Sequence, residues 1–115
     1  MELNRFVALE ELLSLVRSRA DRSIEYSVYW RDGAEDPGLT DEVLVAAPVE
    51  VENDRDVFPP IVVKHGYWIY CSDQLIQDVV DVALGQNASV GNERLLEALR
   101  HYLRKDNFLD VKADE

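Results

Sequence analysis

The run SIEYSVYW, residues 23–30, constrains the fold more than any other segment, because its side chains alternate between apolar and polar. Successive side chains of an extended chain point to opposite faces, so the run predicts a strand with one apolar face. That face carries Ile24, Tyr26, Val28 and Trp30. Only Tyr29 interrupts the polar face. A strand of this kind is stable only in a sheet whose apolar face is covered by another layer.

Three segments carry the apolar stripe of an amphipathic helix and can supply the covering layer. In the first, near residues 8–18, leucine or valine stands at positions 9, 12, 13 and 16, which is the spacing of one helical face. The segments near 73–85 and 92–105 have a similar spacing. Ser72 stands where its side chain can cap the second of these helices.

Two further strands are predicted near residues 42–48 and 61–71. Gly66 marks a turn or bulge in the second segment, which is either one strand or a short hairpin. The whole pattern predicts an α+β fold in the order α-β-β-β-α-α. A small antiparallel sheet of about three strands would be covered by about three helices, in one domain over residues 1–115. The predicted core contains Leu12, Val28, Val45, Ile69, Leu75, Val79, Leu96 and Leu99.

Acidic charge is concentrated in the middle of the chain. The sequence has 12 Lys and Arg against 23 Asp and Glu, a net charge of −11. Residues 31–58 hold nine acids and two arginines, a local net charge of −7. Proteins that bind nucleic acid neutralise phosphates with Lys and Arg, so we expect no nucleic-acid partner. A concentrated field of one sign steers an oppositely charged macromolecule, which predicts a basic protein partner.

Four carboxylates alternate with other residues in PVEVENDRDVFPP, residues 48–60. In one extended strand all four would face the same way, roughly 6 to 7 Å apart. Aromatic residues beside such a row have the composition of a protein interface. The sequence therefore predicts a partner-binding surface made of Asp32, Asp36, Asp41, Glu50, Glu52, Asp54, Asp56, Phe58 and Trp68.

No residue pattern in the chain points to catalysis, so we expect a protein that is not an enzyme and has no cofactor or metal. Cys71 is the only cysteine, His65 and His101 are the only histidines, and phosphate-binding and HExxH motifs are absent. A calcium loop starting at Glu50 would need Gly in its sixth position, where Arg55 stands. An EF-hand is therefore excluded, while an irregular calcium site stays an alternative.

The chain has no apolar stretch that approaches the roughly 18 residues of a membrane span. Its first 22 residues include acids early and have no continuous apolar segment typical of a signal peptide. We therefore expect a cytoplasmic protein without a membrane partner.

Three runs, SIEYSVYW, GYWIYCSDQLIQDVVDVALGQ and NASVGNERLLEALRHYLRKDNFLD, resemble a family of small, acidic, uncharacterised bacterial proteins. Some of these proteins look like immunity proteins of contact-dependent growth inhibition and related polymorphic toxin systems. The resemblance covers roughly residues 23–110, including the acidic middle. It implies an α+β fold and a cytoplasmic, non-enzymatic protein, and it transfers no functional residue.

Two hypotheses about function follow. In the first, the protein is an immunity protein that binds and neutralises a cationic toxin domain, with a nuclease as the main candidate. A nuclease must present Lys and Arg to phosphates, and a row of carboxylates can occupy the same groups. In the second, the protein is an acidic adaptor or protein-binding module unrelated to toxins.

Overall fold

The computed structural model of the chain describes residues 1–19 and 22–112. Residues 20, 21 and 113–115 of the predicted domain lie outside this part. In chain order the described elements are β1 (Arg5–Ala8), α1 (Leu9–Arg17), β2 (Ser27–Arg31), β3 (Glu42–Ala46), β4 (Glu50–Glu52), β5 (Arg55–Val57), α2 (Pro60–Lys64), β6 (Tyr67–Ser72), α3 (Asp73–Gln86) and α4 (Asn92–Lys105). The predicted α+β fold is confirmed.

Four strands form an antiparallel sheet in the order β1-β3-β2-β6. Strand β2 is an inner strand, in which Val28 pairs with Val45 on one side and with Cys71 on the other. The register with β6 shifts between Val28 and Tyr29, as at a β-bulge. All but the last residue of β2 is buried.

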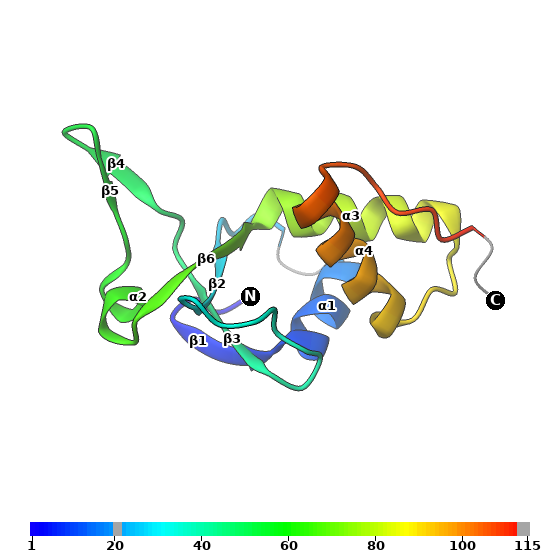
Figure 1. Cartoon of the computed structure of the whole chain (residues 1–115), viewed down its shortest axis with the longest axis horizontal. Coiled ribbons are helices and arrows are strands. Elements are labelled where there is room, and N and C mark those ends of the chain that lie inside the picture. Colours follow the sequence, from blue (N-terminus) through cyan, green and yellow to red (C-terminus); the bar gives the residue numbers. More distant parts are fainter. Residues whose placement is uncertain (20–21, 113–115) are drawn as a thin grey trace.

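Helices α1, α3 and α4 form the main core together with residues of the sheet. Figure 1 shows these three helices gathered at one end of the molecule. Most of their leucine and valine stripes are buried as the sequence predicts, and Leu12, Ile76 and Leu99 are fully buried. Leu103, near the end of α4, is 37% exposed. The hydroxyl of Ser72 accepts a hydrogen bond of 3.2 Å from the backbone N–H of Leu75, which confirms the predicted cap of α3.

A second, smaller core contains Tyr29 and Leu44, which pair across β2 and β3. Both are fully buried, as is Val62 of helix α2. The Tyr29 hydroxyl donates a hydrogen bond of 2.6 Å to the backbone carbonyl of Ala47, which satisfies the polar end of this buried side chain. Tyr29 thus interrupts the expected polar face because β2 has apolar contacts on both of its faces.

The sheet differs from the prediction at its two ends. Strand β1 was not predicted, because its four residues lie directly before an obvious helix and are too few to show a period. Helix α2 replaces the first part of the strand predicted at 61–71. Pro60 begins α2, where proline fits the first turn of a helix, and Gly66 follows it with a φ of +68° that favours glycine.

The strand predicted at residues 23–30 corresponds to β2, which begins only at Ser27. The strand predicted at residues 42–48 corresponds to β3, which ends earlier than predicted, at Ala46. Two members of the predicted core differ as well. Ile69 is 39% exposed on the edge strand β6, so its assignment to the core was wrong. Leu75 is only partly buried and packs against the main core.

Arg22 connects the end of α1 to α3. Its guanidinium donates hydrogen bonds of 2.7 and 2.8 Å to the two carboxylate oxygens of Asp81, and one of 2.9 Å to the carbonyl of Val16. Two parallel hydrogen bonds between an arginine and a carboxylate are among the stronger polar contacts in proteins. The hydrogen bonds from Arg22 hold the pKa of Asp81 below its usual value.

This ion pair predicts a pH-dependent contribution to stability. A carboxyl whose pKa is lowered by folding stabilises the fold above its unfolded pKa, about 3.9 for Asp. We therefore expect Asp81→Asn to lower the free energy of unfolding by a constant amount above about pH 5. That difference from the parent should shrink as the pH falls through and below 4. Urea unfolding at pH 7, 5, 4 and 3 measures it. A difference that stays constant down to pH 3 would contradict the role of Asp81.

Because Leu99 is buried and Ile69 is exposed, we expect their substitution by alanine to have different effects on the free energy of unfolding. Leu99→Ala should lower the free energy of unfolding by about 2 to 5 kcal/mol, since it leaves a cavity in the main core. Ile69→Ala should lower it by less than about 1 kcal/mol, because the side chain is already partly in water. Urea unfolding of both variants measures the difference, and similar losses would mean that α4 is docked differently.

Candidate functional site

The most exposed part of the structure is the β4–β5 hairpin, residues 50–57, which we call the arm. Figure 1 shows the arm projecting from the body at the opposite end from α3 and α4. The molecule is accordingly elongated, with extents of 46 × 28 × 28 Å. All six strand residues of the arm are exposed.

A tight turn at Asn53 and Asp54 reverses the chain within the arm. Both residues have positive φ, 51° and 63°. Two consecutive residues of this kind are the signature of a type I′ turn, whose twist matches that of the two strands it joins. Asn and Asp are among the residues that adopt this left-handed conformation most readily.

The turn divides the predicted row of carboxylates. Glu50 pairs with Val57 and Glu52 with Arg55, so these four residues share one face of the arm. Asp56 pairs with Val51 on the opposite face. The expectation that all four carboxylates face the same way is therefore wrong, because the chain reverses where a straight strand was assumed. The negative charge surrounds the arm instead of following one side of it.

The acids of the arm are not used to stabilise the fold. Among the described residues, the side chains of Glu50, Glu52, Asp54 and Asp56 make no hydrogen bond or ion pair. Acids of the body contrast with them. Asp36 accepts a hydrogen bond of 2.6 Å from Arg104, Asp73 accepts one from the backbone of Tyr26, and Asp81 binds Arg22.

Apolar side chains accompany these acids. Val51 on the arm is 69% exposed and Val57 is 40% exposed. Trp68 of β6, 52% exposed, packs against the ring of Phe58 just after the arm, with ring centroids 4.7 Å apart. The two predicted aromatic residues of the site are therefore in contact. The sequence prediction does not include the two valines, although each has a charged residue beside it in the sequence.

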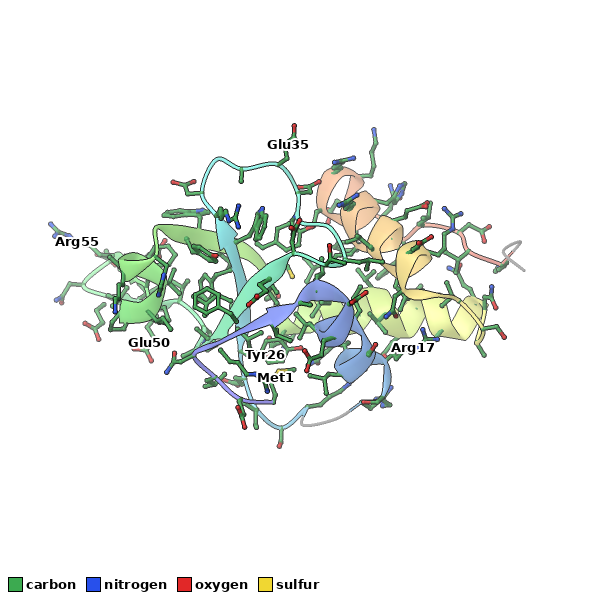
Figure 2. All side chains as sticks on the ribbon, turned by 90° about the horizontal axis from the view of Figure 1, so that it is seen from below. Met1, Arg17, Tyr26, Glu35, Glu50 and Arg55 are labelled. Carbon is green, nitrogen blue, oxygen red and sulfur yellow. The ribbon has the colours of Figure 1, made fainter. Side chains whose placement is uncertain are left out.

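The remaining predicted site residues lie in the loop between β2 and β3. The backbone N–H of Asp32 donates to the carbonyl of Gly66 at 3.4 Å, which places Asp32 beside the turn before β6. Asp36 binds Arg104 of α4, and the Asp41 carboxylate accepts a hydrogen bond from the backbone of Gly38. Figure 2 shows Glu35 of the same loop beside α4 and apart from Glu50 and Arg55. The structure thus separates Asp36 and Asp41 from the arm.

A groove of about 300 Å³ opens at the base of the arm. The chain segments that enter and leave the arm form its walls, because Ala47 and Pro48 precede β4 while Phe58 and Pro59 follow β5. Glu50 and Val57, which face each other across the hairpin, complete the lining at the arm itself. The groove is therefore mainly apolar with one carboxylate.

The side chains of the cysteine and the two histidines are buried or make local contacts. Burial raises the pKa of the Cys71 thiol to about 12, so the thiol is protonated at neutral pH, which disfavours a nucleophilic role. His101 lies 2.6 Å from the side-chain oxygen of Asn107, and the ring of His65 packs edge-on against Phe6. Within residues 1–19 and 22–112 no three His, Cys, Asp or Glu side chains are grouped so that they could hold a metal ion. No helix in the same residues is long and apolar enough to cross a membrane.

Comparison with protein families finds a match over most of the chain. A family model described as a domain of unknown function (DUF7716) matches residues 6–111. The match includes the sheet from its second residue onward, the arm and all four helices. No curated protein and no solved structure matches the chain.

The isolation of the arm predicts that the fold tolerates its removal. Because Glu50 and Val57 are paired, residues 51–56 can be replaced by Asn-Gly, which closes a two-residue hairpin turn. We expect the free energy of unfolding to change by less than about 1 kcal/mol, since no buried side chain is lost. Urea unfolding measures the change, and a loss above about 3 kcal/mol would show that the arm supports the fold.

Proposed function

The chain belongs to the DUF7716 family, and from the geometry of its arm we propose that it is a protein-binding module for a basic partner. The finer proposal is an immunity protein that neutralises a cationic toxin domain with nuclease activity. The observation that carries the proposal is the set of carboxylates on the arm that have no partner within the described residues.

Charge on the arm is costly for the isolated chain. Four carboxylates lie within seven residues, with Arg55 as the one cation among them, so the arm has a net charge of −3. Like charges this close repel one another and weaken a hairpin that is marginal on its own. A basic partner would remove this repulsion and gain favourable charge contacts at the same time.

The neighbouring apolar surface fits a protein as the partner. Large exposed apolar side chains beside charged ones are typical of the centre and rim of protein interfaces. Trp68 and Phe58 form the aromatic part, and the arm adds Val57 on one face and Val51 on the other. A small soluble ligand would use little of such a convex, projecting surface.

A nuclease domain is a suitable basic partner. Its active site must hold phosphates, so it presents Lys and Arg in a region that stays accessible to substrate. A thin arm with carboxylates on both faces can enter such a region and occupy those cations. Binding would then block access of the nucleic acid to the catalytic residues.

The test compares two variants with equal changes in charge. The arm variant contains Glu50→Gln, Glu52→Gln, Asp54→Asn and Asp56→Asn. The control contains Glu25→Gln, Glu42→Gln, Glu93→Gln and Asp106→Asn, all at exposed positions away from the arm. Where a neighbouring gene encodes a basic toxin domain, that domain is purified in an inactive form as the partner. The association and dissociation rates are measured at low and high salt.

We expect the arm variant to associate about 10-fold more slowly or worse at low salt, with a weaker salt dependence than the parent. Dissociation should also accelerate, since a charge pair buried on binding contributes about 2 to 5 kcal/mol. The arm variant should fail to protect cells that express the active toxin, while the control protects. Equal binding and protection by the two variants would contradict the role of the arm. Lack of a toxin gene, with arm-dependent binding to another basic protein, would favour the adaptor over the immunity protein.

A further inference from the structure

The groove at the base of the arm has the chemistry of a pocket for one basic side chain. Of the residues that line it, Glu50 alone is ionisable, and the others present proline rings, a phenyl ring and aliphatic groups or an amide. An acid in an otherwise apolar groove matches a side chain with an apolar stem and a cationic head. We propose that the groove receives a single arginine side chain of the partner. This inference rests on the proposed function and specifies how the arm would recognise its partner.

The groove is large enough for one side chain, and its charge is available to a cation. The volume of about 300 Å³ lies at the lower end of the range of about 300 to 1,000 Å³ for small-molecule sites. No cation lines the groove, so its charge is not neutralised from within. Glu50 also has no side-chain partner among the described residues and is free to bind a guanidinium.

The lining favours arginine over lysine. A guanidinium binds a carboxylate through two parallel hydrogen bonds, stacks on aromatic rings, and loses its hydration more readily than an ammonium group. Phe58 supplies an aromatic ring and Glu50 the carboxylate in the same groove. Glu52 lies on the same face of the arm, one step farther from the body, but it stands opposite Arg55, so Glu50 is the carboxylate available to a cation in the groove.

The walls of the groove are held by the fold and not by the ligand. Pro48 and Pro59 restrict the backbone on both sides, and Phe58 packs against Trp68 as well as against the second core. A groove shaped in advance binds with a smaller loss of conformational entropy than a flexible one. The site should therefore recognise a small probe that carries only the side chain.

The test uses a blocked Gly-Arg-Gly tripeptide as the probe and NMR of the uniformly ¹⁵N-labelled protein. The matched probe replaces arginine by citrulline, which has nearly the same shape but no charge. We expect the arginine probe, at millimolar concentration, to shift the backbone amide signals of Ala47, Glu50, Val57 and Phe58. The citrulline probe should bind at least 5-fold more weakly, and a lysine probe should bind between the two.

Two variants complete the test. Glu50→Gln should weaken binding of the arginine probe at least 5-fold, whereas Glu42→Gln, an exposed position outside the groove, should leave it unchanged. Equal binding of arginine and citrulline, or shifts confined to other regions, would overturn the inference. So would equal binding by the Glu50→Gln variant with an unchanged fold.

The outcome separates this inference from the proposed function. If the arm variant loses its protein partner while the arginine probe leaves the groove unperturbed, the arm binds the partner but the groove is not an arginine pocket. If the probe binds through Glu50 while the partner binds independently of the arm, the pocket is real and the proposed docking surface is wrong.

Discussion

Burial of strands β2 and β3 from both sides is the constraint on which the rest of the structure depends. Val28 and Val45 face the helices, while their neighbours Tyr29 and Leu44 face the second core. A sheet with apolar side chains on both faces needs a covering layer on each face. The short helix α2 supplies part of the second layer through Val62. The second layer also fixes where the arm leaves the body, because Phe58 and Ile61, which follow the arm, pack against it.

The sequence predicts the helices well and the sheet less well, for physical reasons. A helix of 14 residues, such as α3 or α4, repeats its apolar stripe several times, so its period is evident. Strand β1 has four residues and α2 five, too few for a period to appear. The run after Pro60 is rich in β-branched residues, which favour strands, and the proline at the first helical position outweighs that preference.

The candidate site shows the same limit at a smaller scale. The sequence identifies the acids and the two aromatic residues, and the structure brings Phe58 and Trp68 into contact. It does not reveal the reversal at Asn53 and Asp54, because neither residue is the glycine that normally marks a two-residue hairpin. Asp36 binds Arg104 across 68 positions, and no local pattern can predict a contact at that separation.

The arm has a consequence for how the protein changes over generations. A substitution in the core is retained only if the protein still folds, since most changes at buried positions destabilise the protein. The strand residues of the arm are exposed and its acids have no partner in the described chain, so substitutions there have little effect on folding. The charge, size or order of these side chains can therefore change with little loss of stability. If the arm binds a partner as proposed, recognition can follow a changing partner while the body stays the same.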